Sequence, residues 1–123
     1  MSTVPQVHRL FVYGTLRRNA PRNPMQELLA EHSQWLGEAT VQAKLYRVGA
    51  YTGIVYPEQG HVSGEVFTID PAQWDAVMTR LDEYEGADYR RQLIEAVLQS
   101  GETVTAWAYT LAEGRENSAP VTP

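Results

Sequence analysis

The 123-residue chain contains no cysteine. Disulfide bonds, thiolate nucleophiles and cysteine-ligated zinc are therefore excluded. Only three histidines are present, His8, His32 and His61, and they are scattered along the chain without the spacing of a metal-binding helix. The sequence therefore predicts no metal site.

Positive charge and long apolar runs are also scarce. Lys and Arg together number 10 against 15 Asp and Glu, and the net charge of −5 argues against a nucleic-acid-binding surface. No stretch approaches the roughly 18 apolar residues that cross a bilayer, and the first six residues lack the pattern of a signal peptide. We therefore expect a cytoplasmic protein that binds neither nucleic acid nor membrane.

Motifs of several enzyme classes are missing as well. The sequence has no GxGxxG, no GxxxxGK[ST] phosphate loop and no GxSxG nucleophile elbow. Nucleotide-binding and serine-hydrolase functions therefore lack the residues that they need.

The hydrophobic content of 43% suits one compact domain. We expect this domain to span residues 7–111, after a flexible segment at 1–6. Residues 112–123 contain Gly, Glu, Asn, Ser and Pro without an aromatic residue, which predicts a disordered tail.

Strands are expected to outnumber helices. Capping patterns at Asn23-Pro24 and Asp70-Pro71 predict two helix starts, and Gly37 indicates a bend or bulge. The segment Gly49-Ala50-Tyr51-Thr52-Gly53 is expected to interrupt a strand pattern. The predicted strands are 7–13, 35–48, 54–56, 61–69, 89–98 and 103–111, the last two forming a hairpin. This arrangement favours an α+β fold with a small mixed, strongly curved, barrel-like sheet and two flanking helices.

Glu85 is the most informative candidate for chemistry. Counted from Trp74 at about 100° per residue, it falls near 20°, within the apolar arc of the second helix, whereas Glu83 falls near 180° and faces water. Burial would raise the pKa of Glu85 toward neutrality, as a general base requires. Alternatively the helix ends by Tyr84, and Glu85 is a loop acid or an ion-pair partner of Arg91.

Two further features lie near the first strand. The sequence Tyr13-Gly14-Thr15-Leu16 follows its end, where glycine frees backbone N–H groups to converge on an anion or a carbonyl oxygen. The cluster Arg17-Arg18 with Arg22 is either a solvated loop or a clamp for a carboxylate.

The pairing of Val12–Arg17 with Leu81–Gly86 and Tyr89-Arg90-Arg91 resembles the gamma-glutamylcyclotransferase-like superfamily. The YGTL form and short chain look closest to the gamma-glutamylamine cyclotransferase branch and its bacterial relatives. The resemblance covers about residues 8–111. It implies a small mixed β-barrel with flanking helices and a pocket floored by the YGTL loop.

The resemblance also implies roles for individual residues. Glu85 would be the catalytic acid/base, and Arg91 structural. Tyr13, Gly14, Thr15 and Leu16 would hold a gamma-glutamyl group, with Tyr89 lining the pocket. The implied enzyme needs no cofactor and releases 5-oxoproline. One departure concerns Tyr51, which is followed by Thr52 where many relatives carry an aromatic residue and then proline. The rim of the pocket, and hence the leaving group that it accepts, therefore stays open.

A different class of function keeps this fold without catalysis, as a module that binds a small carboxylate-bearing metabolite. The expected partner is in either case a small molecule. The sequence does not decide the oligomeric state.

Overall fold

The computed structural model describes residues 7–14, 16, 23–48 and 51–112. Four residues singled out in the sequence, Thr15, Arg17, Arg18 and Arg22, lie outside the described residues, as do the terminal segments 1–6 and 113–123. The predictions of a flexible start and a disordered tail therefore stay predictions.

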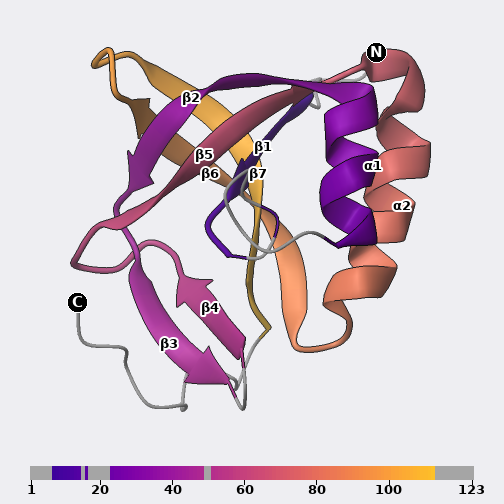
Figure 1. Ribbon diagram of the computed structural model, residues 1–123. Coiled ribbons are helices and arrows are strands. Elements are labelled where there is room, and N and C mark those ends of the chain that lie inside the picture. The colour runs from indigo at the N-terminus through magenta and orange to yellow at the C-terminus, as the bar shows by residue number, and fades with distance from the viewer. Residues whose placement is uncertain (1–6, 15, 17–22, 49–50, 113–123) are drawn as a thin grey trace, which may run out of the picture.

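The described residues form one seven-stranded sheet and two α-helices (Figure 1). The helices are α1 (Pro24–His32) and α2 (Trp74–Glu85), and a 3₁₀ turn, η1 (Pro71–Gln73), precedes α2. The strands are β1 (Arg9–Val12), β2 (Ser33–Val41), β3 (Lys44–Val48), β4 (Tyr51–Val55), β5 (Val62–Ile69), β6 (Tyr89–Leu98) and β7 (Thr103–Leu111).

Five of these strands close into a barrel. Their order is β1-β5-β2-β6-β7, and a parallel pairing of β1 with β7, at Leu10↔Trp107 and Phe11↔Ala108, joins the two ends. The other barrel pairings are antiparallel. The β3–β4 hairpin extends the sheet beyond the barrel, where Ile54 pairs in parallel with Thr110. The predicted α+β class with a mixed, barrel-like sheet and two helices is confirmed.

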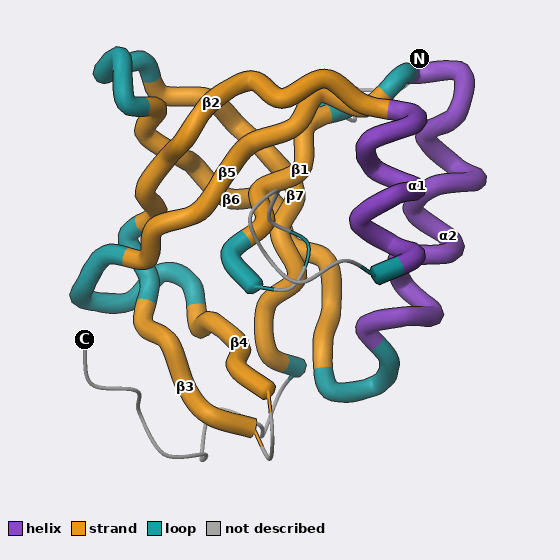
Figure 2. The backbone as a smooth tube through the Cα atoms, viewed as in Figure 1, coloured by secondary structure: helices purple, strands orange, loops and turns teal. Residues whose placement is uncertain are grey.

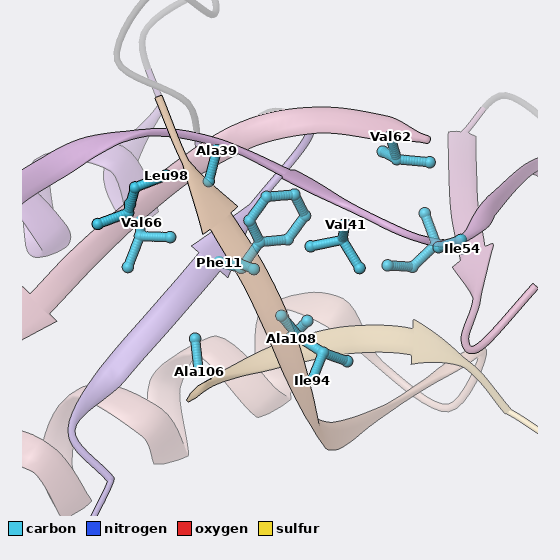
Figure 3. Close-up of a cluster of buried hydrophobic side chains, with 12 residues drawn as sticks. Phe11, Ala39, Val41, Ile54, Val62, Val66, Ile94, Leu98, Ala106 and Ala108 are labelled. Atoms are coloured by element: carbon cyan, nitrogen blue, oxygen red, sulfur yellow. The ribbon is translucent and has the colours of Figure 1, made fainter. Parts of the chain in front are cut away.

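Strand alternation divides the apolar core into two parts. On β1, Phe11 points into the barrel, whereas Leu10 and Val12 belong to a second cluster that packs against the helices. Figure 3 shows the barrel interior, where Phe11 lies among side chains of several strands. This cluster comprises Phe11, Ala39, Val41, Ala43, Ile54, Val62, Val66, Ile94, Ala96, Leu98, Ala106 and Ala108.

The two helices lie together on one side of the barrel (Figure 2). Their buried residues, Met25 and Leu29 on α1 and Val77, Met78 and Leu81 on α2, complete the second cluster. This inward face of α2 is the one that the spacing of apolar residues predicted.

The capping predictions are confirmed for α1 and shifted for α2. The Asn23 side chain accepts a hydrogen bond from the Gln26 N–H at 2.9 Å, at the start of α1. Asp70 accepts from the Ala72 N–H at 3.0 Å, but it caps η1, and the α-helix begins only at Trp74. A tight first turn at Pro71 therefore precedes the regular helix.

The prediction of one long strand over 35–48 is wrong. The chain forms β2 and β3, separated at Gln42 and Ala43, and the two strands have different partners. Ala43 is buried in the barrel core, and the Gln42 carbonyl accepts a bond from the Glu58 N–H. The chain thus leaves the barrel at this point. The predicted irregularity at Gly37 is confirmed by a register shift between β2 and β5.

The predicted interruption over 49–53 is wrong for Tyr51–Gly53, because these residues begin β4. Residues 49–50 lie outside the described residues. A Cβ atom on Gly53 would lie 2.3 Å from Leu111 Cδ2 and 2.9 Å from Tyr89 Cε1. Glycine at this position therefore allows β4 to approach two neighbouring side chains, instead of breaking the strand.

Candidate active site

The end of α2 places a carboxylate at the edge of the second core cluster. Glu85 is the last helical residue, and Gly86, with φ of 78°, ends the helix while its N–H donates to the Asp82 carbonyl at 3.0 Å. Glu83 is exposed, whereas Glu85 is half-buried. The alternative in which the helix stops by Tyr84 is therefore wrong.

Glu85 lines a cavity of ≈ 370 Å³ between the helix end and the strands. The predicted site residues that the structure describes, Tyr13, Gly14, Leu16, Glu85 and Tyr89, all line this cavity. Thr15 lies outside the described residues. The fold therefore brings together three segments that are far apart in the sequence, from the start of the chain, the end of α2 and the start of β6.

Burial raises the pKa of Glu85 from its usual 4.5 to about 7. Its carboxylate has no hydrogen bond or ion pair to another residue in the part of the chain that the structure describes. A group with this pKa can both accept and return a proton near neutral pH.

Arg91, the residue considered as a partner for Glu85, pairs instead with Asp82. Arg91 Nε lies 3.0 Å from Asp82 Oδ1, and Arg91 Nη2 donates to Oδ2 at 3.1 Å. The guanidinium also lies 5.7 Å from the centre of the Trp107 ring. Arg91 therefore forms its ion pair with Asp82, and Glu85 faces the cavity without this partner.

The hydroxyls of Tyr13 and Tyr89, which both line the cavity, are bonded to backbone groups. The Tyr13 hydroxyl donates to the Tyr109 carbonyl at 2.6 Å and accepts from the Ile54 N–H at 3.2 Å. The Tyr89 hydroxyl donates to the Thr52 carbonyl at 2.6 Å. Each hydroxyl proton is thus held by a backbone carbonyl and is not available to donate to a ligand.

Both hydroxyls stay neutral at physiological pH. Burial, with the nearby charge of Glu85 as a smaller cause, raises the pKa of Tyr89 to about 12. Burial likewise raises the pKa of Tyr13. Glu85 is consequently the cavity residue best suited to exchange protons near pH 7 among those described.

Of the other lining tyrosines, Tyr84 and Tyr109 were not identified from the sequence, whereas the resemblance associates Tyr51 with the rim of the pocket. Tyr51 and Tyr84 lie at the cavity with exposed fractions of 68% and 42%, and Tyr109 is buried at 5%. The alternation of side chains along β7 is the sequence signal that could have predicted Tyr109 on the face toward the helices. Its hydroxyl partner, Asp82, follows only from the tertiary structure, since 27 residues separate them.

A second hollow of ≈ 460 Å³ adjoins the first, and the two share Tyr89 and Tyr109. It is lined also by Asp82, Arg91 and Trp107. Although this hollow is larger, it contains neither Glu85 nor Gly14, and its carboxylate and guanidinium already pair with each other. The first cavity is therefore the better candidate for chemistry.

The described part of the chain offers neither a cluster of metal ligands nor a membrane-spanning helix. No cluster of three or more His, Asp or Glu residues could hold a metal ion there. No helix in the same part is long and apolar enough to cross a membrane.

The fold and the cavity define a class of protein, a small closed mixed barrel with a cavity that a half-buried glutamate and a glycine after the first strand both line. Residues 10–122 match the family described as "Gamma-glutamyl cyclotransferase, AIG2-like". The chain belongs to this family, as the resemblance predicted.

Individual relatives agree with this assignment. A protein of Methanocaldococcus jannaschii named "Putative gamma-glutamylcyclotransferase" is 30% identical over 109 residues, which cover 85% of this chain and 84% of the relative. A Drosophila melanogaster protein with the same descriptive name is 28% identical over 112 residues, covering 84% and 69%. The crystal structure of an AIG2-like protein from Mus musculus has a TM-score of 0.72 at 20% identity, covering 93% and 85%, and supports the fold alone.

Proposed function

We propose that this protein is a gamma-glutamylcyclotransferase that converts a gamma-glutamyl compound into 5-oxoproline and a free amine or amino acid. The observation that carries the proposal is the placement of Glu85, half-buried and with a pKa of about 7, in a cavity that Gly14 also lines. Membership of the family supports the same reaction.

In the proposed reaction the substrate supplies its own nucleophile. Glu85 takes a proton from the substrate's α-ammonium group, and the resulting amine attacks the gamma-carbonyl carbon of the same molecule. A ring C–N bond forms, and the C–N bond to the leaving amine breaks. The two protons lost by the α-ammonium end on the departing amine, one of them through Glu85. Because both reacting groups belong to one molecule, no serine or cysteine nucleophile is required.

The loop after β1 would stabilise the oxyanion formed during attack. Backbone N–H groups around Gly14 and Thr15 are the candidates, and such a donor is commonly worth about 3 kcal/mol. The rings of Tyr13 and Tyr89 would enclose the gamma-glutamyl chain, since their hydroxyl protons are already held by backbone carbonyls.

The first experiment is NMR detection of 5-oxoproline after incubation with gamma-glutamyl amino acids, gamma-glutamyl amines, ε-(gamma-glutamyl)lysine and glutathione. We expect at least one of these to be turned over. If none yields 5-oxoproline, a module that binds a small metabolite without turnover becomes the preferred function, and ligand-induced shifts in the same spectra would report the binding.

The second experiment tests Glu85. Glu85→Gln should lower turnover by about 10²- to 10⁴-fold with little change in substrate binding, because it removes a proton acceptor while keeping the side-chain shape. Glu83→Gln on the exposed side of α2 is the matched control and should retain wild-type turnover. Full activity in Glu85→Gln would exclude the proposed role.

The pH dependence provides a further test. A base with a pKa of about 7 must be deprotonated to act, so the wild-type rate should rise with pH through about 7. The substrate's α-ammonium contributes a separate limb at higher pH. The residual activity of Glu85→Gln should lack the acid limb, and an unchanged acid limb in the variant would assign it to another group.

A further inference from the structure

Tyr109 joins the two sides of the candidate site. Its hydroxyl donates to Asp82 Oδ1 at 2.7 Å, and its backbone carbonyl accepts from the Tyr13 hydroxyl at 2.6 Å. Asp82 lies three residues before Glu85, and Tyr13 directly precedes Gly14. One residue of β7 is therefore bonded both to the last turn of α2 and to Tyr13, the first residue of the YGTL motif.

We propose that Tyr109 is a positioning residue, which holds the last turn of α2, and with it Glu85, at a set place relative to Tyr13 and Gly14. This inference rests on the function proposed above. Tyr109 acts through Asp82 and through Tyr13.

The bond between Tyr109 and Asp82 stabilises the last turn of α2, which the helix itself holds only weakly. This turn ends at Gly86, and the backbone carbonyls of a final helical turn lack partners within the helix, so an unsupported end opens readily to water. Asp82 is anchored twice, by the bidentate Arg91 and by Tyr109. Arg91 and Tyr109 come from the adjacent strands β6 and β7 and pair directly in register. The helix end is thus fixed to the barrel wall itself.

The Tyr109 hydroxyl makes no hydrogen bond to a described residue other than Asp82. Tyr109 is 5% exposed, and burial, followed by its hydrogen bond to Asp82, raises the pKa of Tyr109. The hydroxyl therefore remains a neutral donor to Asp82 throughout the working pH range. A phenylalanine would fill the same space without this bond, which isolates the proposed contribution.

The test compares Tyr109→Phe with Tyr56→Phe. The Tyr56 hydroxyl accepts from the Glu95 N–H at 3.2 Å, and Tyr56 does not line the cavity. Each variant thus loses one hydroxyl and one hydrogen bond between elements. Tyr109→Phe should lower kcat by about tenfold with KM within about threefold, because a small displacement of a catalytic group costs rate more than binding. Tyr56→Phe should keep wild-type kcat.

A second readout does not depend on turnover. The carboxyl ¹³C resonance of Glu85, titrated by NMR, should give an apparent pKa near 7 in wild type and a lower one in Tyr109→Phe, since a loosened helix end admits water. All titratable groups around Glu85 in the described cavity, except the mutated residue, are common to the two proteins: they are Tyr13, Tyr51, Tyr84, Asp88, Tyr89 and Tyr109. A structural bond without a positioning role would lower the melting temperature and leave the titration unchanged.

A second pair of variants covers the case in which Tyr109→Phe does not fold. Asp82→Asn combined with Arg91→Gln keeps an oxygen acceptor for the Tyr109 hydroxyl and changes no net charge, so the Glu85 titration should stay near that of wild type. Asp82→Ala combined with Arg91→Gln removes the acceptor and should lower the Glu85 pKa. Equal titrations in these two double variants would overturn the inference.

The two proposals fail in different ways. If no gamma-glutamyl compound is turned over but the titration of Glu85 responds to Tyr109→Phe, the proposed function is wrong and the positioning role stands. If turnover occurs while neither kcat nor the titration responds, only the positioning role is wrong.

Discussion

At the residue scale, Glu85 combines two properties that oppose each other. Its place at the cavity makes its pKa suitable for proton transfer, and the same burial makes the ionised form unfavourable in the folded state. The Glu85 carboxylate has no hydrogen-bond or ion-pair partner among the described residues, so the loss of its hydration lowers the stability of the fold. Such a cost is common where a side chain serves chemistry. The cost should therefore be visible in the pH dependence of unfolding.

Glu85→Gln is expected to stabilise the protein above neutral pH. The folded-state pKa of about 7 exceeds the usual 4.5, so the stability associated with Glu85 is present below pH 4.5 and is lost as pH rises through 7. Glutamine stays neutral at every pH. Urea unfolding at pH 8 should show a gain of about 1–3 kcal/mol over wild type, and unfolding at pH 5 should show a much smaller difference. Glu83→Gln, on the exposed face, should show no such pH-dependent gain.

At the element scale, the close packing of β1 against β5 leaves no space for a side chain at position 64 of β5. An ideal Cβ on Gly64 would lie 2.2 Å from the Val12 carbonyl oxygen and 2.7 Å from Phe11 Cζ. The obstacle is partly backbone, which cannot move without separating the strands. The position also lies close to the cavity, because Phe11 and Val12 line it.

Gly64→Ala should therefore destabilise the protein by about 1–3 kcal/mol, as overpacking does. The matched variant is Gly37→Ala on β2, where the nearest atom, Leu98 Cδ2, is at an ordinary 3.7 Å. That change should be neutral or stabilising by up to about 1 kcal/mol. Midpoints of urea unfolding measure both, and equal midpoints would contradict the close approach of β1 and β5.

At the scale of the whole molecule, one interior cluster links all five barrel strands. Phe11, Val41, Val66, Ile94 and Ala108 each come from a different strand and share this interior (Figure 3). The parallel pairing of β1 with β7 joins strands from the two ends of the described chain. A loss of packing at one interior position should therefore weaken the entire barrel, and with it the placement of the site.

Val66→Ala and Val97→Ala test this with the same chemical change. Val66 on β5 is fully buried, whereas Val97 on β6 is 44% exposed. Removing the buried methyl groups should cost about 1–3 kcal/mol, and the exposed substitution should cost less than about 0.5 kcal/mol. The loss for Val66→Ala should appear at the same urea concentration by circular dichroism and by tryptophan fluorescence. Two separate transitions would argue against a single cooperative barrel.

Features that depend on neighbouring residues were determined by the sequence itself. The cap at Asn23, the inward face of α2 and the extents of β6 and β7 were predicted from spacing and turn residues. The apolar arc of α2 also singled out Glu85, because side-chain direction repeats with the helical period. The roles of Glu85 and of the YGTL residues in catalysis stay predictions.

Other features were decided only by the tertiary structure. The division of 35–48 into two strands and the inclusion of Tyr51–Gly53 in β4 depend on which strands pair, and barrel closure joins Leu10 to Trp107 across most of the chain. The choice of Asp82 rather than Glu85 as the partner of Arg91 belongs to the same group. These contacts form between segments that are distant in the sequence, so no local sequence pattern predicts them. They determine that Asp82 pairs with Arg91 and that Glu85 faces the cavity.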